Sequence, residues 1–201
     1  MEVKNNKTEN PLAYYREKFK TMDPEAMGNK SCVKYENGVF SHRLLNREVR
    51  IKWPEMTGTY EDGSPLGDYN LILVSRYIME GAAAPAGDKM YSYPEMPWGP
   101  VYERQFKGRC INRLSGTYGR NPEGFKKACS LLGGISVKGG DLAYDIEFMP
   151  QLKLRLILWL PDEEFPANAQ ILFSENFPLA FTAEDMAVVG DVLLNAMKGK
   201  W

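Results

Sequence analysis

The sequence is poor in the residues that build metal sites and covalent-catalysis sites. Its 201 residues include three cysteines and one histidine. Cys32, Cys110 and Cys129 are far apart and form no CxxC motif, so neither a zinc ribbon nor a cysteine-ligated iron–sulfur cluster is encoded locally. We therefore expect no intrinsic metal site. We interpret His42 as a surface or core residue, and Cys110 and Cys129 as core residues.

An excess of basic charge and long hydrophobic runs are also missing. The net charge is −1 and the isoelectric point is near 6.0, so no general electrostatic attraction to nucleic acid is expected. The apolar runs are too short to span a membrane, and the polar N-terminus lacks the apolar core of a signal peptide. Few, unpaired cysteines fit a reducing compartment. These features predict a cytoplasmic protein with neither nucleic-acid nor membrane partners.

Common catalytic and nucleotide-binding motifs are not found either. The glycine pairs at 133–134 and 139–140 belong to neither a GxGxxG motif nor a phosphate-binding loop, and no GxSxG or HExxH occurs. The composition, 44% hydrophobic and 25% charged, is that of an ordinary globular protein. A chain of this length suits one domain, and residues 1–9 are expected to be disordered.

The most patterned stretch is 151–173. Four leucines alternate with Lys153, Arg155, Ile157 and Trp159, which is the period of a strand with one buried face. The other face begins charged and ends apolar, so we expect it to be covered near Trp159. Pro161 ends this strand because it has no N–H to donate. A second apolar run, 169–173, predicts another strand.

Further strands are expected on both sides of the chain's middle. Residues 32–53 are expected to form a meander with a tight turn at Asn37-Gly38, a strong hairpin signal, and a weaker turn at Asn46-Arg47. Pro54 closes the meander, and 55–63 is expected to be a polar loop. A strand at 143–148 is expected to pair with the central one as a hairpin.

Helices are indicated by capping residues followed by proline and by apolar periodicity. The expected helical segments are 11–22, 24–28, one opening at Ser64-Pro65 and continuing through the apolar run 69–79, 99–114, 122–132 and 182–198. Along the chain, a group of strands is thus followed by a group of helices and then by a second group of strands. The sequence predicts a single α+β domain with a mainly antiparallel sheet packed with helices.

One candidate ligand site combines a long loop with a charged residue of the apolar helix. The loop, 81–99, carries Tyr91, Tyr93 and Trp98, and Arg76 is the one charge within 69–79. Aromatic faces suit a flat or apolar ligand, and an arginine suits a carboxylate or phosphate. We hypothesise that Arg76 points into a cleft roofed by this loop. Alternatively, Arg76 only extends its head to solvent, and the aromatic residues only pin the loop.

A second candidate is the acidic cluster Asp162, Glu163 and Glu164, which follows directly on the central strand. Such carboxylates, with a possible contribution from Asp141, are suited to binding a divalent cation or to acid–base catalysis. The alternative is a solvated turn whose charges protect a sheet edge.

The run LRLILWLPDEEFPANAQILFSENFPLAFTAEDMAVVGDVL resembles the C-terminal signature of the family catalogued as domain of unknown function 3786. The run LILVSRYIM, the segment YSYPEMPWGPVYERQF and the GGD turn are also similar, so the resemblance covers about residues 69–197. It is most specific at 159–173. In the family pattern a histidine often precedes the tyrosine of the central helix, where this chain has Arg76.

The resemblance implies a protein of anaerobic bacteria or archaea. Some members of the family carry an iron–sulfur domain that this chain lacks. It transfers no catalytic residues and no histidine-based chemistry. Three functions stay open. The first is a small-ligand-binding or accessory protein of anaerobic metabolism. The second is an enzyme or metal-dependent site at the acidic cluster. The third is a structural protein that docks a protein partner.

Overall fold

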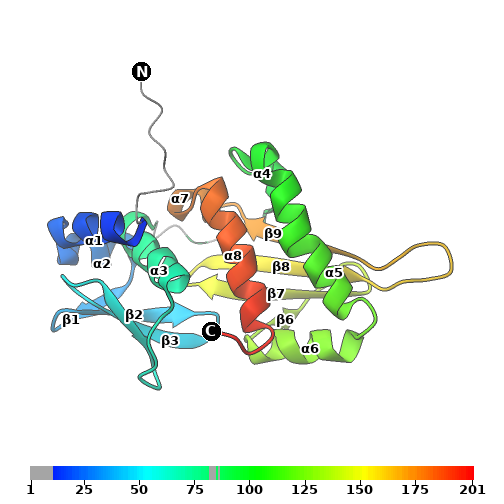
Figure 1. Cartoon of the computed structure of the whole chain (residues 1–201), viewed down its shortest axis with the longest axis horizontal. Coiled ribbons are helices and arrows are strands. Elements are labelled where there is room, and N and C mark those ends of the chain that lie inside the picture. The colour runs from blue at the N-terminus through cyan, green and yellow to red at the C-terminus, as the bar shows by residue number, and fades with distance from the viewer. Residues whose placement is uncertain (1–10, 82–84, 86) are drawn as a thin grey trace.

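The computed structural model describes residues 11–81, 85 and 87–201, and it has an α+β fold with two antiparallel sheets (Figure 1). The expected fold class is confirmed, although the predicted strands divide between two sheets. The disorder expected for residues 1–9 lies outside the described residues. A continuous cluster of buried apolar side chains extends across both sheets, which makes this a single domain.

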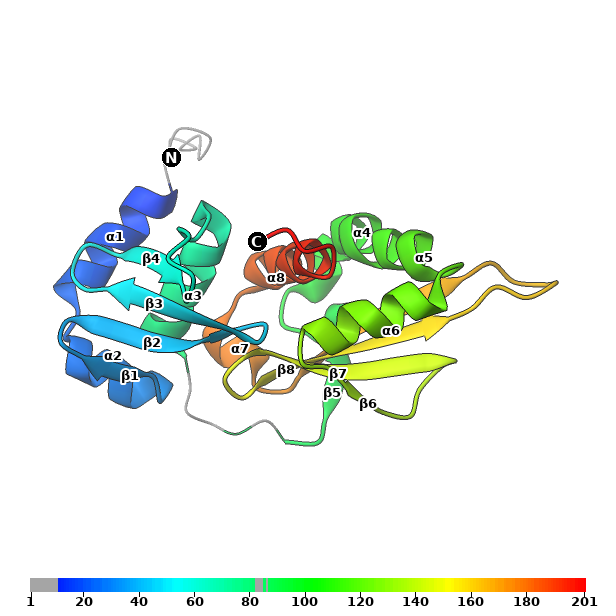
Figure 2. The same ribbon diagram turned by 90° about the horizontal axis from the view of Figure 1, so that it is seen from below.

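The first sheet lies at one end of the molecule with three helices around it (Figure 2). Its strands follow chain order: β1 (Lys34–Glu36), β2 (Val39–Leu44), β3 (Arg47–Lys52) and β4 (Thr57–Tyr60). The helices are α1 (Pro11–Thr21), α2 (Pro24–Ser31) and α3 (Asp68–Glu80). The polar loop expected at 55–63 therefore contains a short edge strand, because Thr57–Tyr60 completes the ladder beside β3.

The second sheet has the order β5-β9-β8-β7-β6, and the helices of the C-terminal half cover one of its faces (Figure 2). Its strands are β5 (Met90–Ser92), β6 (Ile135–Ser136), β7 (Leu142–Met149), β8 (Leu152–Trp159) and β9 (Asn168–Ser174). The helical segments are η2 (Tyr93–Glu95), α4 (Gly99–Phe106), η3 (Lys107–Ile111), α5 (Asn112–Tyr118), α6 (Pro122–Leu131), α7 (Phe177–Ala180) and α8 (Ala183–Ala196).

The predicted central strand is the middle strand of this second sheet. Leu154, Leu156 and Leu158 of β8 are fully buried under the helices, and the hairpin with β7 is confirmed. The expected cover over Trp159 is wrong, because this side chain is 36% exposed. The turn at Gly140 covers Ile157 and only touches the edge of the Trp159 ring, and the loop that joins β8 to β9 projects from the body (Figure 1).

Two turns show how local sequence sets the first sheet. Asn37 and Gly38 form a two-residue hairpin turn with φ values of 51° and 78°, as the sequence predicts. The next turn is formed by Leu45 and Asn46 rather than by Asn46 and Arg47. Leu45 is buried, and its N–H donates to the carbonyl of Phe148 in β7. This contact joins the two sheets, and it accounts for a leucine with positive φ.

The segment expected as one helix to residue 114 is longer and changes its geometry. It continues through α4, the π-helical turn η3 and α5 to Tyr118. The helix expected to open at Ser64-Pro65 instead begins at Asp68, because Thr59 and Pro65 still bridge as strand neighbours. The loop expected over 81–99 contains β5 and η2, and residues 82–84 and 86 of that loop lie outside the described residues.

Candidate functional site

A groove of about 730 Å³ lies between α3, α4, α7 and α8, and we call it the Arg76 groove. Its wall includes Arg76 and Glu80 of α3, Trp98 and Val101 at the start of α4, and Leu179 of α7. The groove therefore brings together two of the four residues of the first sequence-predicted site, Arg76 and Trp98. Tyr91 and Tyr93 do not line it.

Arg76 is tied down by two residues that are distant in the chain. Its Nη1 donates to the hydroxyl of Tyr15 at 2.7 Å and to the carboxylate of Asp185 at 2.9 Å. The two charged side chains are 16% and 12% exposed. Asp185 compensates the charge of Arg76, so an anionic ligand would have to compete with this carboxylate. The anion-binding role hypothesised for Arg76 is correspondingly weakened.

Trp98 stands at the mouth of the groove with its side chain 77% exposed. Its backbone φ is 65°, a left-handed conformation that is unfavourable for a bulky residue. The next residue, Gly99, packs directly against the carbonyl oxygen of Tyr93, where a Cβ would clash. The tight turn thus holds a large apolar ring in solvent, a combination of backbone strain and exposure that is often found at binding sites.

Tyr93 and Tyr91 attach this loop to the body of the protein. The ring of Tyr93 stacks on Phe106 at 4.1 Å, and its hydroxyl donates to the carbonyl of Ala183 at 2.7 Å. Burial raises the pKa of Tyr93 to about 12. Tyr91 lies in β5 opposite Phe173 of β9 and is partly buried. Of the two roles that the sequence leaves open for these tyrosines, both contacts favour anchoring.

The acidic cluster lies in the projecting loop between β8 and β9, away from helices α3 and α7 (Figure 1). None of its residues lines the Arg76 groove. Asp162 accepts hydrogen bonds from the backbone N–H groups of Phe165 and Glu164, which lower the pKa of its carboxyl. Glu163 and Glu164 are exposed. Asp141 accepts from the N–H of Leu160 instead of joining them. Of the two interpretations of the acidic cluster, these contacts favour the solvated turn.

No group of three or more His, Cys, Asp or Glu residues within 11–81, 85 and 87–201 is placed to hold a metal ion. His42 is buried beside the ring of Tyr77, and burial lowers its pKa to about 4. Cys110 and Cys129 are buried, as expected, and burial raises the pKa of each thiol to about 12. These residues are therefore parts of the core. In the described part of the chain, no helix is both long and apolar enough to cross a membrane.

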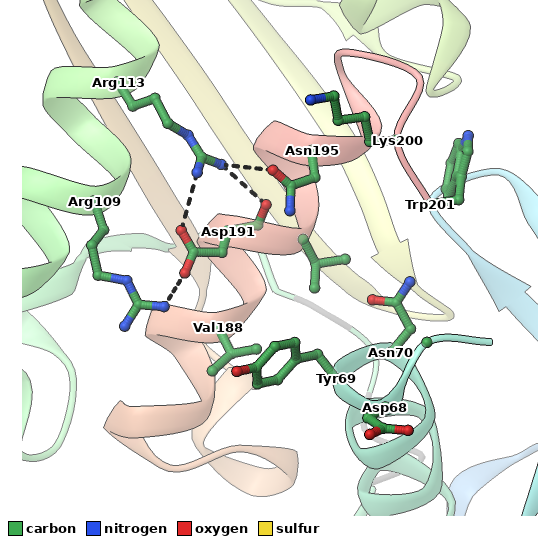
Figure 3. Close-up of a pocket in the computed structure, with 12 residues that line it drawn as sticks. Asp68, Tyr69, Asn70, Arg109, Arg113, Val188, Asp191, Asn195, Lys200 and Trp201 are labelled. Atoms are coloured by element: carbon green, nitrogen blue, oxygen red, sulfur yellow. Dashed lines mark hydrogen bonds and ion pairs between the residues drawn. The ribbon is translucent and has the colours of Figure 1, made fainter.

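A second pocket, of about 340 Å³, opens where the C-terminal segment passes the start of α3 (Figure 3). We call it the Trp201 pocket. Its lining includes Tyr69 of α3, Trp201, and Arg109 and Arg113. The two arginines belong to the continuous helix formed by α4, η3 and α5, which we call the long helix. The sequence contains one signal of this site, two arginines four residues apart and therefore on one helical face. Nothing local to the sequence places Trp201 beside them.

The model of the family described as domain of unknown function (DUF3786) matches residues 23–196. The chain belongs to this family, and the match extends the sequence resemblance to the first sheet and α2. No curated protein and no solved structure shows a significant match to the chain. The Arg76 groove lies within the matched range, whereas Trp201 lies beyond it.

Proposed function

We propose that the protein is a small-ligand-binding module whose Arg76 groove takes a mainly apolar ligand. The anaerobic metabolic setting implied by the family resemblance belongs to the same proposal. The single observation that carries it is Trp98, a large ring held in solvent by a strained backbone at the mouth of a groove of ligand size. An exposed tryptophan on a rigid turn supplies contact area at little cost in side-chain entropy.

The lining of the groove indicates the ligand's chemistry. Val101, Leu179 and Met186 give it an apolar wall. Its charged groups are Arg76, which Asp185 compensates, together with Glu80 and Glu184. Glu80 is paired with Lys18 and Lys30. Such a site favours a neutral or cationic molecule over an anionic one, because its one cation already has a carboxylate partner.

Glu184 provides the polar end of this site. One of its carboxylate oxygens accepts from the hydroxyl of Tyr102 at 2.5 Å, and this contact raises the pKa of Tyr102. Among the described residues, Glu184 has no cationic partner. A ligand that donates a hydrogen bond or carries a positive charge would find an acceptor there, with its apolar body against Trp98.

The test uses the neutral fluorescent probe N-phenyl-1-naphthylamine, titrated into the purified protein. We expect saturable binding to the wild type. Trp98→Gly removes the ring while tolerating the positive φ, and Leu179→Asp places a charge in the apolar wall. Each change should weaken probe binding about tenfold or more, the usual effect of removing a dominant apolar contact.

Leu131→Asp is the matched control, because Leu131 is also an exposed leucine at a helix end but lies outside the groove. Equal probe affinity for Leu179→Asp and Leu131→Asp would contradict the proposal. Native mass spectrometry of protein purified anaerobically is a second test. It should identify a bound natural ligand, and that ligand should be lost in the Trp98→Gly variant.

A second candidate is docking of a protein partner at the same place. It is favoured by the exposure of Trp98, Val101 and Leu179 around one groove, since exposed apolar patches mark interaction surfaces. The two candidates differ in a measurement on the isolated protein. Stoichiometric probe binding supports the ligand site, whereas a lack of probe binding favours the docking surface.

A further inference from the structure

The Trp201 pocket is assembled from four parts of the structure (Figure 3). The start of α3 contributes Tyr69 and Asn70, and α8 contributes Asp191 and Asn195. The long helix adds the two arginines, which lie beside α8 and contact Asp191, and the segment after α8 closes the pocket. This site is independent of the Arg76 groove, so its test does not depend on the function proposed above.

The geometry of the long helix brings both arginines to one carboxylate. Arg109 lies in the π-helical turn η3, and Arg113 follows one turn later in α5. Both contact the carboxylate of Asp191, Arg113 through its Nη1 at 3.4 Å. The Nη2 of Arg113 also donates to the backbone carbonyl of Asp191 at 3.2 Å and to the side-chain oxygen of Asn195 at 3.4 Å. The Nε of Arg113 is buried and has no hydrogen-bond partner among the described residues. Single π-helical turns are rare and occur frequently at functional sites.

The side-chain charges of the pocket are not balanced. Its lining has three cationic side chains, from Arg109, Arg113 and Lys200, and two side-chain carboxylates, from Asp68 and Asp191. Lys200 is exposed, and its Nζ pairs with no described residue. Asp68 lies at the far side of the pocket from Arg113 (Figure 3). The side with the arginines therefore has an excess of positive charge, and an anion there would gain charge-assisted hydrogen bonds.

Aromatic rings line the rest of the pocket. Trp201 is held by an edge-on contact with Tyr60 and by the guanidinium of Arg47, 5.0 Å from its ring. Tyr69 is largely exposed, and Asn70 lies between Tyr69 and Trp201 (Figure 3). Asn70 donates to the hydroxyl of Tyr60, which leaves its side-chain oxygen as an acceptor toward a ligand. A flat ring with polar edges matches these surfaces.

We propose that the Trp201 pocket binds a small anion that carries a flat ring. The anionic group lies at Arg109, Arg113 and Lys200, and the ring lies against Tyr69 and Trp201. A cavity of about 340 Å³ admits a ligand of this size. Two sources share this chemistry, a nucleoside monophosphate and an aromatic carboxylate.

Isothermal titration calorimetry with four probes tests the proposal on the full chain. Adenosine monophosphate and benzoate represent the two sources, adenosine supplies a ring without charge, and inorganic phosphate supplies charge without a ring. We expect at least one ring-bearing anion to bind about tenfold or more tightly than both adenosine and phosphate, as expected for a charge-assisted contact. Whichever of adenosine monophosphate and benzoate binds more tightly identifies the source. Absence of binding by both at millimolar concentration overturns the proposal.

Three substitutions assign the binding to this pocket. Lys200→Gln should weaken the tighter anion about fivefold or more, the effect of losing one charge-assisted contact, whereas Lys198→Gln, in the same exposed tail but outside the pocket, should not. Asp191→Asn should strengthen binding, because it removes the carboxylate that competes for the two arginines. A merely structural Asp191 would not increase anion affinity. Equal affinities for Lys200→Gln and Lys198→Gln overturn the assignment, even if Asp191→Asn fails to fold.

Discussion

The guanidinium of Arg76 in α3 lies 2.9 Å from the carboxylate of Asp185 in the first turn of α8. Asp185 also accepts hydrogen bonds from the N–H and hydroxyl of Thr182, which completes the capping box at the start of α8. One carboxylate thus caps a helix, compensates an arginine and joins the helix of the first sheet to the last helix of the chain. The Arg76 groove lies beside this junction.

We predict that Asp185→Asn lowers the free energy of unfolding by about 3 kcal/mol, because it leaves Arg76 partly buried without its counter-ion. Arg76→Met should cost less, since Asp185 keeps its bonds to Thr182. Urea unfolding of both single variants and the double variant measures this. Additive costs in the double variant would show that the pair is not coupled. A larger cost for Arg76→Met would contradict the penalty expected for the unpaired arginine.

The central strand gives a second prediction. Leu156→Ala should lower the free energy of unfolding by about 2–5 kcal/mol, because Leu156 is fully buried between neighbouring strands and the helix layer. Lys153→Ala, on the exposed face of the same strand, should change it by no more than about 0.5 kcal/mol. Equal shifts in the urea midpoint would mean that the buried face of β8 is assigned incorrectly.

His42 should make stability depend on pH. Its pKa is lowered from 6.5 to about 4 by burial, so the folded state binds the proton less readily than the unfolded state. The contribution of neutral His42 to the free energy of unfolding is therefore fully present above pH 6.5 and is lost as the pH falls toward 4. Between pH 7.5 and pH 5 we expect a loss of about 2 kcal/mol from this residue.

The matched variant for this measurement is His42→Leu, which removes the titrating ring. Other groups titrate equally in both proteins, so the difference between their urea unfolding curves at the two pH values isolates His42. If the two proteins lose the same stability between pH 7.5 and pH 5, the neutral buried state of His42 is refuted.

A pair of glycines tests the packing of α8 against the π-helical turn. A Cβ on Gly190 would lie 2.6 Å from Sγ of the buried Cys110, so Gly190→Ala should destabilise the protein by about 1–3 kcal/mol through overpacking. Gly116 in α5 has open space around it, and Gly116→Ala should raise stability by up to about 1 kcal/mol. Thermal unfolding of both variants measures the difference. Stabilisation by both changes would show that α8 lies farther from η3 than described.

The sequence by itself determined the features that depend on neighbouring residues. Asn37 and Gly38 can both adopt positive φ, which sets the first hairpin. Asp23 and Asn121 accept a hydrogen bond from the first turn of the helix that each precedes, and the following proline suits the first helical position. The alternating leucines identified the buried strand β8 because strand side chains alternate between two faces.

Only the tertiary structure decided which distant residues meet. Arg76 and Asp185 are separated by 109 positions, and no local pattern indicates that the carboxylate of Asp185 would compensate the arginine. The sequence likewise could not place Trp201 against Tyr60, because that contact depends on the turn after α8 and on the packing of the two sheets. Periodicity shows which face of an element is buried, whereas the partner of that face is set by packing of the whole chain.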